Sequence, residues 1–289
     1  NSVESEGFDL AKINLNFSDL AGVIMVGIYH EDFVLKLQNM ELPMVLVDEN
    51  IPSEDIQTVL IDNTDGIIRA CKFLAELGHK RVAYLSKEKN EASAYERYYG
   101  FKHSCELFGF DKDEALVAET QMRIDSAFES MMSILDRVAE PPTAVLAYND
   151  IIALGAMAAI HQRGLSIPGD VSVVGFDDIR LARESVPPLT TVHVPKRLMG
   201  AVAVQRLLHV IQGRNEPLHK VLIPTRLKVR ESTGPPKGAV GGKGNTASAV
   251  GKPSGDDVSG ERPSSANGRG SSRTAAVNPD TGRETSTSD

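Results

Sequence analysis

Hydrophobic positions along the chain alternate between short apolar runs and longer stretches with helical spacing. Short runs predict strands at 23–28, 43–47, 59–61, 81–85, 143–147, 171–174, 190–192, 221–223 and 227–229. Amphipathic or apolar helical patterns occupy 32–40, 62–77, 91–108, 125–138, 151–160 and 195–212. Because strands and helices take turns along the chain, the predicted fold class is α/β, with parallel sheets flanked by helices.

One strand–helix–strand unit at 143–178 organises this prediction. Asn149 is a good N-cap residue and opens an almost wholly apolar helix, and Gly164 can end it. The second strand leads directly into Asp177 and Asp178. Parallel strands joined by a crossover have their carboxyl ends at one edge of the sheet, where ligands bind. We therefore expect Asn149 and Asp177 to point into one crevice.

Composition is that of an ordinary globular protein, with 41% hydrophobic residues and a net charge of −8. No basic patch stands out, which argues against nucleic-acid binding by this chain alone. Cys71 and Cys105 lack CxxC spacing and suggest buried thiols in a reducing compartment. The apolar runs are too short to span a bilayer, so no membrane association is expected. Residues 234–289 contain no aromatic residue and no Leu, Ile or Met, and we expect 233–289 to be a disordered tail.

The sequence offers no reactive constellation. Asp177 and Asp178 are a carboxylate pair, but adjacent strand residues point to opposite faces unless the backbone turns. There is no Gly-x-Ser-x-Gly elbow and no P-loop, and the seven histidines have no partner at metal spacing. His79 is interpreted as a structural residue at a helix-to-strand turn. The prediction is a protein that is not an enzyme, with no catalytic residue, no metal and no cofactor.

Binding is better supported than catalysis. Ser86, Asn149 and Asp177 each end a predicted strand, and Arg97 lies on the helix that follows the strand of Ser86. A guanidinium, a carboxylate and a carboxamide together can form bidentate hydrogen bonds with vicinal hydroxyls or a heteroaromatic base. The neighbouring aromatic side chains, Tyr148 and Phe176, can cover an apolar face of a ligand.

Each of these residues also has a purely structural alternative. Asn149 would only cap its helix, Asp177 would only cap a helix or close a turn, and Tyr148 and Phe176 would belong to the core. Arg97 would be a solvated helix residue paired with Glu96 or Glu91. Asp150 is interpreted as a first-turn partner of the helix dipole, outside the pocket.

Several segments resemble the lactose/galactose-repressor (LacI/GalR) family of bacterial transcription regulators. They are ELGHKRVAYLS (76–86), ERYYGF (96–101), PPTAVLAYNDIIALGAMAAI (141–160), IPGDVSVVGFDD (167–178) and PPLTTV (187–192). LPMVLVD (42–48), DNTDG (62–66) and RLKVREST (226–233) add to the match. These motifs stand in the family's order over about 200 residues, which makes the resemblance specific.

The resemblance implies a two-lobed core like that of type I periplasmic binding proteins, with the ligand between the lobes. An N-terminal lobe would combine 1–61 with 193–215, and a C-terminal lobe would combine 62–192 with 216–232. Arg97, Asn149 and Asp177 match the effector-contacting positions. Asp48 resembles a further contact from the other lobe, with a turn residue as its structural alternative.

The same resemblance implies a cytoplasmic homodimer that binds a small effector, with a sugar expected here. Operator DNA would be bound through an N-terminal helix-turn-helix headpiece, to which nothing in this chain is similar. The first strand and helix of the N-terminal lobe are also expected to be missing.

Two other functions stay open on the residues alone. An exported sugar-binding protein of the same design would carry a lipobox signal where a regulator has its helix-turn-helix. An enzyme on an α/β scaffold would need a nucleophile–base pair and turnover of sugar derivatives.

Overall fold

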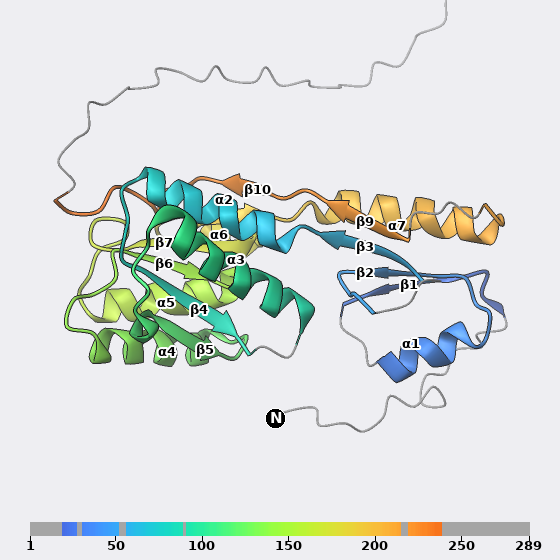
Figure 1. Ribbon diagram of the computed structural model, residues 1–289, viewed down its shortest axis with the longest axis horizontal. Helices are drawn as coiled ribbons and strands as arrows, with labels where there is room; N and C mark the ends of the chain where they lie inside the picture. The colour runs from blue at the N-terminus through green and yellow to red at the C-terminus, as the bar shows by residue number, and fades with distance from the viewer. Residues whose placement is uncertain (1–18, 28–30, 52–55, 89–90, 215–218, 239–289) are drawn as a thin grey trace, which may run out of the picture. The chain divides into compact units, whose positions relative to one another are not determined.

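The computed structural model describes residues 19–27, 31–51, 56–88, 91–214 and 219–238. Within these residues the strands form two sheets, one of four strands and one of six (Figure 1). Four parallel strands make up the first sheet in the order β1-β2-β3-β9, namely β1 (Val23–Val26), β2 (Met44–Val47), β3 (Gln57–Ile61) and β9 (Lys220–Ile223). Two helices accompany it, α1 (Glu31–Gln38) and α7 (Lys196–Ile211).

The six-stranded sheet has the order β10-β8-β7-β6-β4-β5. Its strands are β4 (Val82–Lys87), β5 (Val117–Thr120), β6 (Ala144–Ala147), β7 (Ser172–Asp177), β8 (Thr190–His193) and β10 (Arg226–Lys228). All neighbours pair in parallel except β10, which runs antiparallel to β8. The predicted α/β class is confirmed, and the antiparallel edge strand is an exception to the parallel sheet that the sequence predicted.

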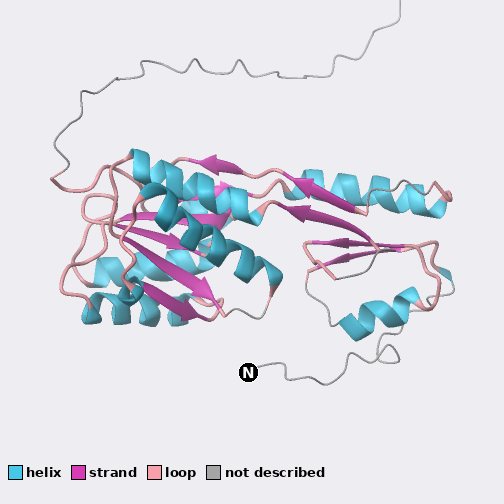
Figure 2. Ribbon diagram, in the orientation of Figure 1, coloured by secondary structure: helices cyan, strands magenta, loops and turns pink. Residues whose placement is uncertain are grey.

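Helices cover both faces of the six-stranded sheet (Figure 2). Alternate residues of β4 separate two cores: Val82 and Tyr84 pack with α2 (Asn63–Glu76) and α3 (Ala92–Phe108), whereas Ala83 and Leu85 face the opposite side. That side is covered by α4 (Ile124–Arg137) and α5 (Asp150–Gln162). Strands buried on both faces are apolar throughout, which explains the uninterrupted runs in the sequence.

The chain crosses between the two sheets three times within the described residues, from β3 to α2, from β8 to α7 and from β9 to β10. The last crossing corrects an expected boundary. Residues 216–232 were assigned together to the C-terminal lobe, but β9 pairs with β3 in the four-stranded sheet. Only the part from β10 onward joins the six-stranded sheet, because its partner there is β8.

The expected tail also begins later than 233. Ser232 donates a hydrogen bond to the carbonyl oxygen of Val173 at 2.6 Å, and Thr233 Oγ1 lies 3.0 Å from Thr190 Oγ1. Gly234 receives a hydrogen bond from Ser172 Oγ at 3.0 Å. These contacts attach the first residues of the expected tail to the six-stranded sheet, although the tail is polar in composition. Residues 239–289 lie outside the described part of the chain.

His79 lies between α2 and β4, as predicted, and helps to hold the segment around Gly234. Its Nε2 is 2.9 Å from the Gly234 carbonyl oxygen, and its Nδ1 is 3.0 Å from Thr143 Oγ1. Burial lowers the pKa of His79 below its usual value. Burial thus disfavours the protonated ring, and the imidazole bridges Thr143 and Gly234 as a structural residue.

Two described elements lack a clear sequence signal. β5 (Val117–Thr120) is an edge strand with only half of its residues apolar, and α6 (Arg180–Glu184) has only five residues. Strand and helix periodicity cannot be recognised in segments this short. Among the described residues, no helix combines the length and apolar character needed to cross a membrane.

Gly155 allows close packing of α4 against α5, and this leads to a stability prediction. A Cβ at this position would lie 2.4 Å from the Ile124 carbonyl oxygen and 2.6 Å from Ala127 Cβ. We expect Gly155→Ala to destabilise the fold by about 1–3 kcal/mol, because overpacking outweighs the gain of about 1 kcal/mol in helix propensity. The measurement is urea unfolding followed by circular dichroism.

The matched control is Gly200→Ala in α7, where nothing lies within 4 Å of the added Cβ. This substitution should raise stability by up to about 1 kcal/mol. If both variants changed the free energy of unfolding by the same amount, the packing argument for Gly155 would be wrong.

Candidate ligand-binding site

Arg97 is buried, with 4% of its surface exposed, and its guanidinium is held from several sides. Nε donates to Asn63 Oδ1 at 2.7 Å, and Nη1 donates to the carbonyl oxygen of Tyr148 at 2.7 Å. The guanidinium carbon lies 3.7 Å from the centre of the Phe176 ring and 4.5 Å from that of Tyr148. These contacts orient the side chain and leave Nη2 as the group that approaches the Asp177 carboxylate, at 3.6 Å. The solvated alternative for Arg97 is wrong.

Asp177 stands at the carboxyl end of β7, where the backbone turns sharply. Its φ is 106° and that of Asp178 is 52°, so two consecutive residues other than glycine occupy the left-handed half of backbone space. The turn sends the two carboxylates to different partners: Asp177 to Arg97, and Asp178 to Arg183, His193 and Arg230. They do not form an acid/base pair.

Asn149 and Tyr148 follow β6, the strand beside β7. Asn149 Oδ1 accepts a hydrogen bond from the amide of Ile152 at 3.0 Å, so the residue does cap α5. The side-chain NH₂ group of Asn149 therefore remains available to donate a hydrogen bond to a ligand. Tyr148 packs in the core, and its hydroxyl lies 3.0 Å from Ser93 Oγ. Both residues therefore combine a structural contact with a place in the pocket wall.

A pocket of about 280 Å³ joins these groups. Its wall includes five of the seven predicted positions, namely Asp48, Arg97, Tyr148, Asn149 and Asp177. A second hollow of about 440 Å³ shares Asp48 and Asp177 and is otherwise mainly apolar, with Val47, Ile61 and Val194 in its wall. Polar and apolar surfaces thus meet at the two aspartates.

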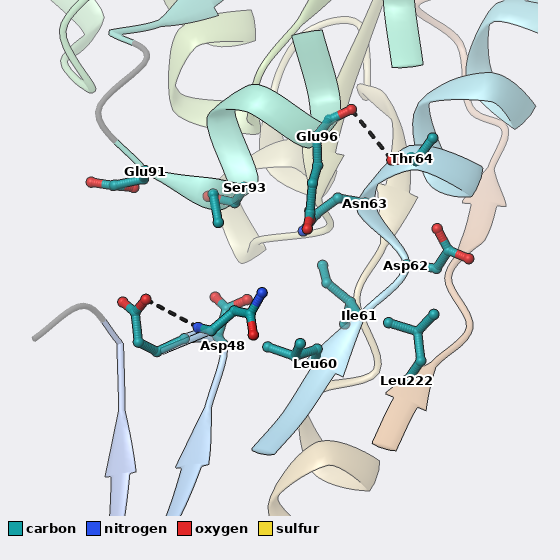
Figure 3. A pocket seen from close by; sticks show the side chains of 13 residues that line it. Asp48, Leu60, Ile61, Asp62, Asn63, Thr64, Glu91, Ser93, Glu96 and Leu222 are labelled. Atoms are coloured by element: carbon teal, nitrogen blue, oxygen red, sulfur yellow. Dashed lines mark hydrogen bonds between the residues drawn. The ribbon is translucent and has the colours of Figure 1, made fainter. Parts of the chain in front are cut away.

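A third, smaller hollow of about 140 Å³ continues from Asp48 along the start of α3. Figure 3 shows Asp48 facing Glu91 and Ser93 across it, with Asn63 beside Glu96. Asn63 Nδ2 donates to Glu96 Oε2 at 2.8 Å, while its Oδ1 accepts from Arg97. Asn63 therefore links the walls of two hollows.

The carboxylates of the pocket are electrostatically coupled. Burial raises the pKa of Asp177 above its usual value, and the positive charges of Arg97 and Lys196 oppose the rise. Asp48 is exposed at the pocket mouth, yet the surrounding walls remove enough water from its carboxylate to raise its pKa as well, again against Arg97. Lys87 forms an ion pair with Glu91 in the same wall. The pocket offers donors and acceptors of both charges.

Two predicted site residues do not face the pocket. Ser86 is fully buried, and its hydroxyl donates to the Lys87 carbonyl oxygen at 2.8 Å. Phe176 is also fully buried, beneath the Arg97 guanidinium, so its ring cannot cover a ligand in this arrangement. Both corrections follow from the strand pleat, which turns alternate side chains into the core.

Sequence reasoning also missed residues that the structure brings into the site. Asn63 was predicted only as part of the helical segment 62–77, and it lies in the first turn of α2, directly after the N-cap residue Asp62. Lys87, Glu91 and Ser93 gave no signal beyond their closeness in sequence to Arg97. Within the part of the chain that the structure describes, no cluster of three or more His, Cys, Asp or Glu residues could hold a metal ion.

Two sheets are joined by three crossings within the described residues, and polar side chains gather at the carboxyl ends of their strands, where α/β proteins commonly bind ligands. Residues 71–233 match a family described as "Periplasmic binding protein-like domain". The chain belongs to this family, and its resemblance to the effector-binding core of the LacI/GalR regulators is confirmed.

Two relatives of known class are transcription regulators. The chain is 32% identical over 216 residues to the HTH-type transcriptional regulator DegA of Bacillus subtilis (strain 168), which covers 74% of this chain and 64% of DegA. It is 32% identical over 191 residues to the HTH-type transcriptional repressor CytR of Escherichia coli (strain K12), which covers 66% of this chain and 56% of CytR. Both relatives are named as transcription regulators, the class of protein that the sequence resemblance implied.

Two solved structures of transcription regulators are also similar to this chain. The complex of the transcriptional regulator CelR with cellobiose has a TM-score of 0.68 and 31% identity, covering 74% of this chain and 66% of CelR. A LacI family regulator from Enterococcus faecium with bound ribose has a TM-score of 0.67 and 26% identity, covering 75% and 81% of the two chains. Our chain spans 64% of the length of DegA and 56% of that of CytR.

Proposed function

We propose that the chain is the effector-binding core of a transcription regulator, and that its effector is a small sugar held by Arg97, Asn149, Asp177 and Asp48. The observation that carries the proposal is the buried Arg97 guanidinium, fixed by Asn63 and Tyr148 so that Nη2 points to Asp177. A carboxylate beside an oriented guanidinium can accept from one hydroxyl while the guanidinium donates to its neighbour. Vicinal hydroxyls fit this arrangement.

The charge of the pocket favours a neutral ligand over an anionic one. Its wall carries three carboxylates, of Asp48, Glu91 and Asp177, and two cations, of Lys87 and Arg97. Phosphate or carboxylate on a ligand would meet a net negative wall. The apolar hollow beside the two aspartates suits the CH face of a sugar ring or a hydrophobic substituent. Cellobiose and ribose in the two related structures support the same ligand class.

Regulation would follow from the three crossings between the sheets. We infer that the sheets correspond to two lobes, with Asp48 contributed by one and Asn149, Arg97 and Asp177 by the other. A ligand that contacts both lobes can favour one arrangement, provided that it binds that arrangement more tightly. The regulator would act in the cytoplasm as a homodimer, and its operator affinity would depend on the effector through a DNA-binding segment that this chain does not resemble.

A thermal-shift screen with monosaccharides, disaccharides and purines tests the site. A sugar at 100 times its dissociation constant should stabilise the protein by about 2.7 kcal/mol. Asp177→Ala should weaken binding of that sugar by about 2–5 kcal/mol, because a charged hydrogen-bond acceptor is lost from a largely desolvated site.

Asp136→Ala is the matched control, since this carboxylate is exposed and pairs with Arg163 on the surface. It should leave sugar affinity unchanged. The proposed site is refuted if Asp177→Ala binds the sugar as tightly as the control does, and the sugar class is refuted if only purines shift the melting temperature.

A further inference from the structure

Asp150 is a fully buried carboxylate next to the pocket residue Asn149, yet it does not line the pocket. Both of its oxygens are used by other elements of the sheet. Oδ1 accepts a hydrogen bond from Thr191 Oγ1 of β8 at 2.5 Å, and Oδ2 accepts one from the amide of Ile179 at 2.8 Å. A first-turn carboxylate that only balanced the dipole of α5 would have no reason to reach these two groups.

The two groups that Asp150 holds flank the turn after β7. Ile179 is the second residue beyond Asp177, and Thr191 Oγ1 also accepts from the amide of Asp178 at 3.4 Å. Both amides that follow Asp177 are thus tied to one carboxylate, one directly and one through Thr191. The tied segment is the one in which Asp177 and Asp178 have positive φ, a conformation that surrounding contacts must maintain.

Gly175 provides independent support for a built contact. A Cβ at this position would lie 2.3 Å from Asp150 Oδ1. The glycine in β7 therefore makes the room in which the carboxylate approaches the strand that carries Asp177. The Asp150 carboxylate can pack against β7 and the turn that follows it only because residue 175 has no side chain.

We propose that Asp150 is a positioning residue for ligand binding, which locks the 177–179 turn and thereby aims the Asp177 carboxylate at the ligand and at Arg97. The inference rests on the proposed function, because Asp177 must be a ligand contact for its aim to matter. Burial raises the pKa of Asp150 to about 7, because the buried position between α5, β7 and β8 disfavours the charged carboxylate.

Three variants separate positioning from general stability. Asp150→Ala removes both acceptors, Asp150→Asn keeps one, and Thr191→Val removes only the bridging hydroxyl. With the sugar identified in the screen, Asp150→Ala should weaken binding at least ten-fold, and the other two variants should show smaller losses. Calorimetric titration gives the dissociation constants, and the two milder variants keep the test valid if Asp150→Ala does not fold.

A double-mutant cycle provides the decisive comparison. In the Asp177→Ala background, the Asp150 and Thr191 substitutions should change the dissociation constant less than two-fold, because the residue they position is gone. An equal loss in both backgrounds would overturn the proposal, since a structural role elsewhere in the pocket would be additive.

Amide hydrogen exchange tests the turn without any ligand. In Asp150→Asn and Thr191→Val, the amides of Asp178 and Ile179 should exchange at least ten-fold faster, whereas the interior amides of α5 stay unchanged. Asp125→Asn is the matched control, because Asp125 is also a first-turn carboxylate but pairs with Arg123 on the surface. Unchanged exchange at both turn amides overturns the inference. If no sugar binds the wild type but exchange responds, the proposed ligand class fails while the lock on the turn stands.

Discussion

Arg97→Ala is expected to reduce the affinity for the sugar effector by a factor of 100 or more, equivalent to about 2.7 kcal/mol. The guanidinium is the central cation of the pocket and contacts Asn63 of α2, Tyr148 directly after β6 and Asp177 at the end of β7. Its loss removes the donor that faces the ligand. It also leaves the Asp177 carboxylate without its main compensating charge. Isothermal titration calorimetry on wild type and variant measures the difference.

The pH dependence of binding should change in the same variant. Arg97 opposes the rise in the pKa of Asp177 and of Asp48 that burial causes. Without it, both pKa values rise further, so each carboxylate stays protonated to a higher pH. Sugar binding that needs the Asp177 carboxylate should then fall off at a higher pH in the variant than in the wild type as the solution is acidified.

Arg97→Lys serves as the matched variant. Lysine keeps the charge but cannot donate to Asn63, Tyr148 and Asp177 in one plane, so affinity should fall less than in Arg97→Ala and the pH profile should stay near that of the wild type. Both variants leave the buried Asn63 Oδ1 with a lost or weakened donor, which costs about 1–3 kcal/mol of stability. Full affinity in Arg97→Ala, with or without a stability loss, would contradict the site.

The sequence predicts that Asn149 and Asp177 lie close together, because the secondary structure alone brings their two positions to the same edge of the sheet. Asn149 and Asp177 end neighbouring parallel strands, and that edge is fixed once the strand–helix–strand unit is recognised. Arg97 was expected near this edge from its position on the helix, and it lies in the pocket wall, but its burial was not evident from the sequence. Asp48 was predicted as a site residue only from the family resemblance.

What could not be predicted depends on contacts between distant parts of the chain. Asn63 meets Arg97 across 34 positions, and Asp150 meets Thr191 across 41. β9 joins the four-stranded sheet through β3, more than 150 residues earlier. No local pattern carries such information, so Asp150 was interpreted only as a first-turn residue and Asn63 only as part of a helical segment.

Asp178→Ala is expected to have the largest effect on stability. The side chain of Asp178 is 2% exposed and has partners from three segments: Arg183 in α6, His193 at the end of β8 and Arg230 beyond β10. Arg230 lies 2.5 Å from Asp178 Oδ1 and His193 Nδ1 lies 2.8 Å from Oδ2. The carboxylate therefore ties the turn after β7 to the crossing after β8 and to the chain beyond the antiparallel edge strand.

Removing one partner of a buried ion pair costs about 3–5 kcal/mol when the other charge stays buried. Here the cations left behind are partly open to water, Arg183 the most at 59% and Arg230 the least at 18%. Because they can regain hydration, we expect a loss of about 2–3 kcal/mol for Asp178→Ala. Asp178→Asn keeps an acceptor without the charge and should lose less. Chemical unfolding at pH 7 measures both.

Acid unfolding provides an independent check of the same carboxylate. Burial alone would raise the pKa of Asp178, but hydrogen bonds from Arg230, Arg183 and His193 hold it well below its usual value. A depressed pKa in the folded state gives stability that is present above the unfolded-state pKa of about 4 and is lost as the pH falls toward the folded value. Wild type should therefore lose stability more steeply than Asp178→Ala below about pH 4. The prediction is contradicted if the acid-unfolding curves of wild type and Asp178→Ala are parallel and their free energies of unfolding at pH 7 differ by less than about 0.5 kcal/mol. Asp178 would then not stabilise the contacts between these three segments.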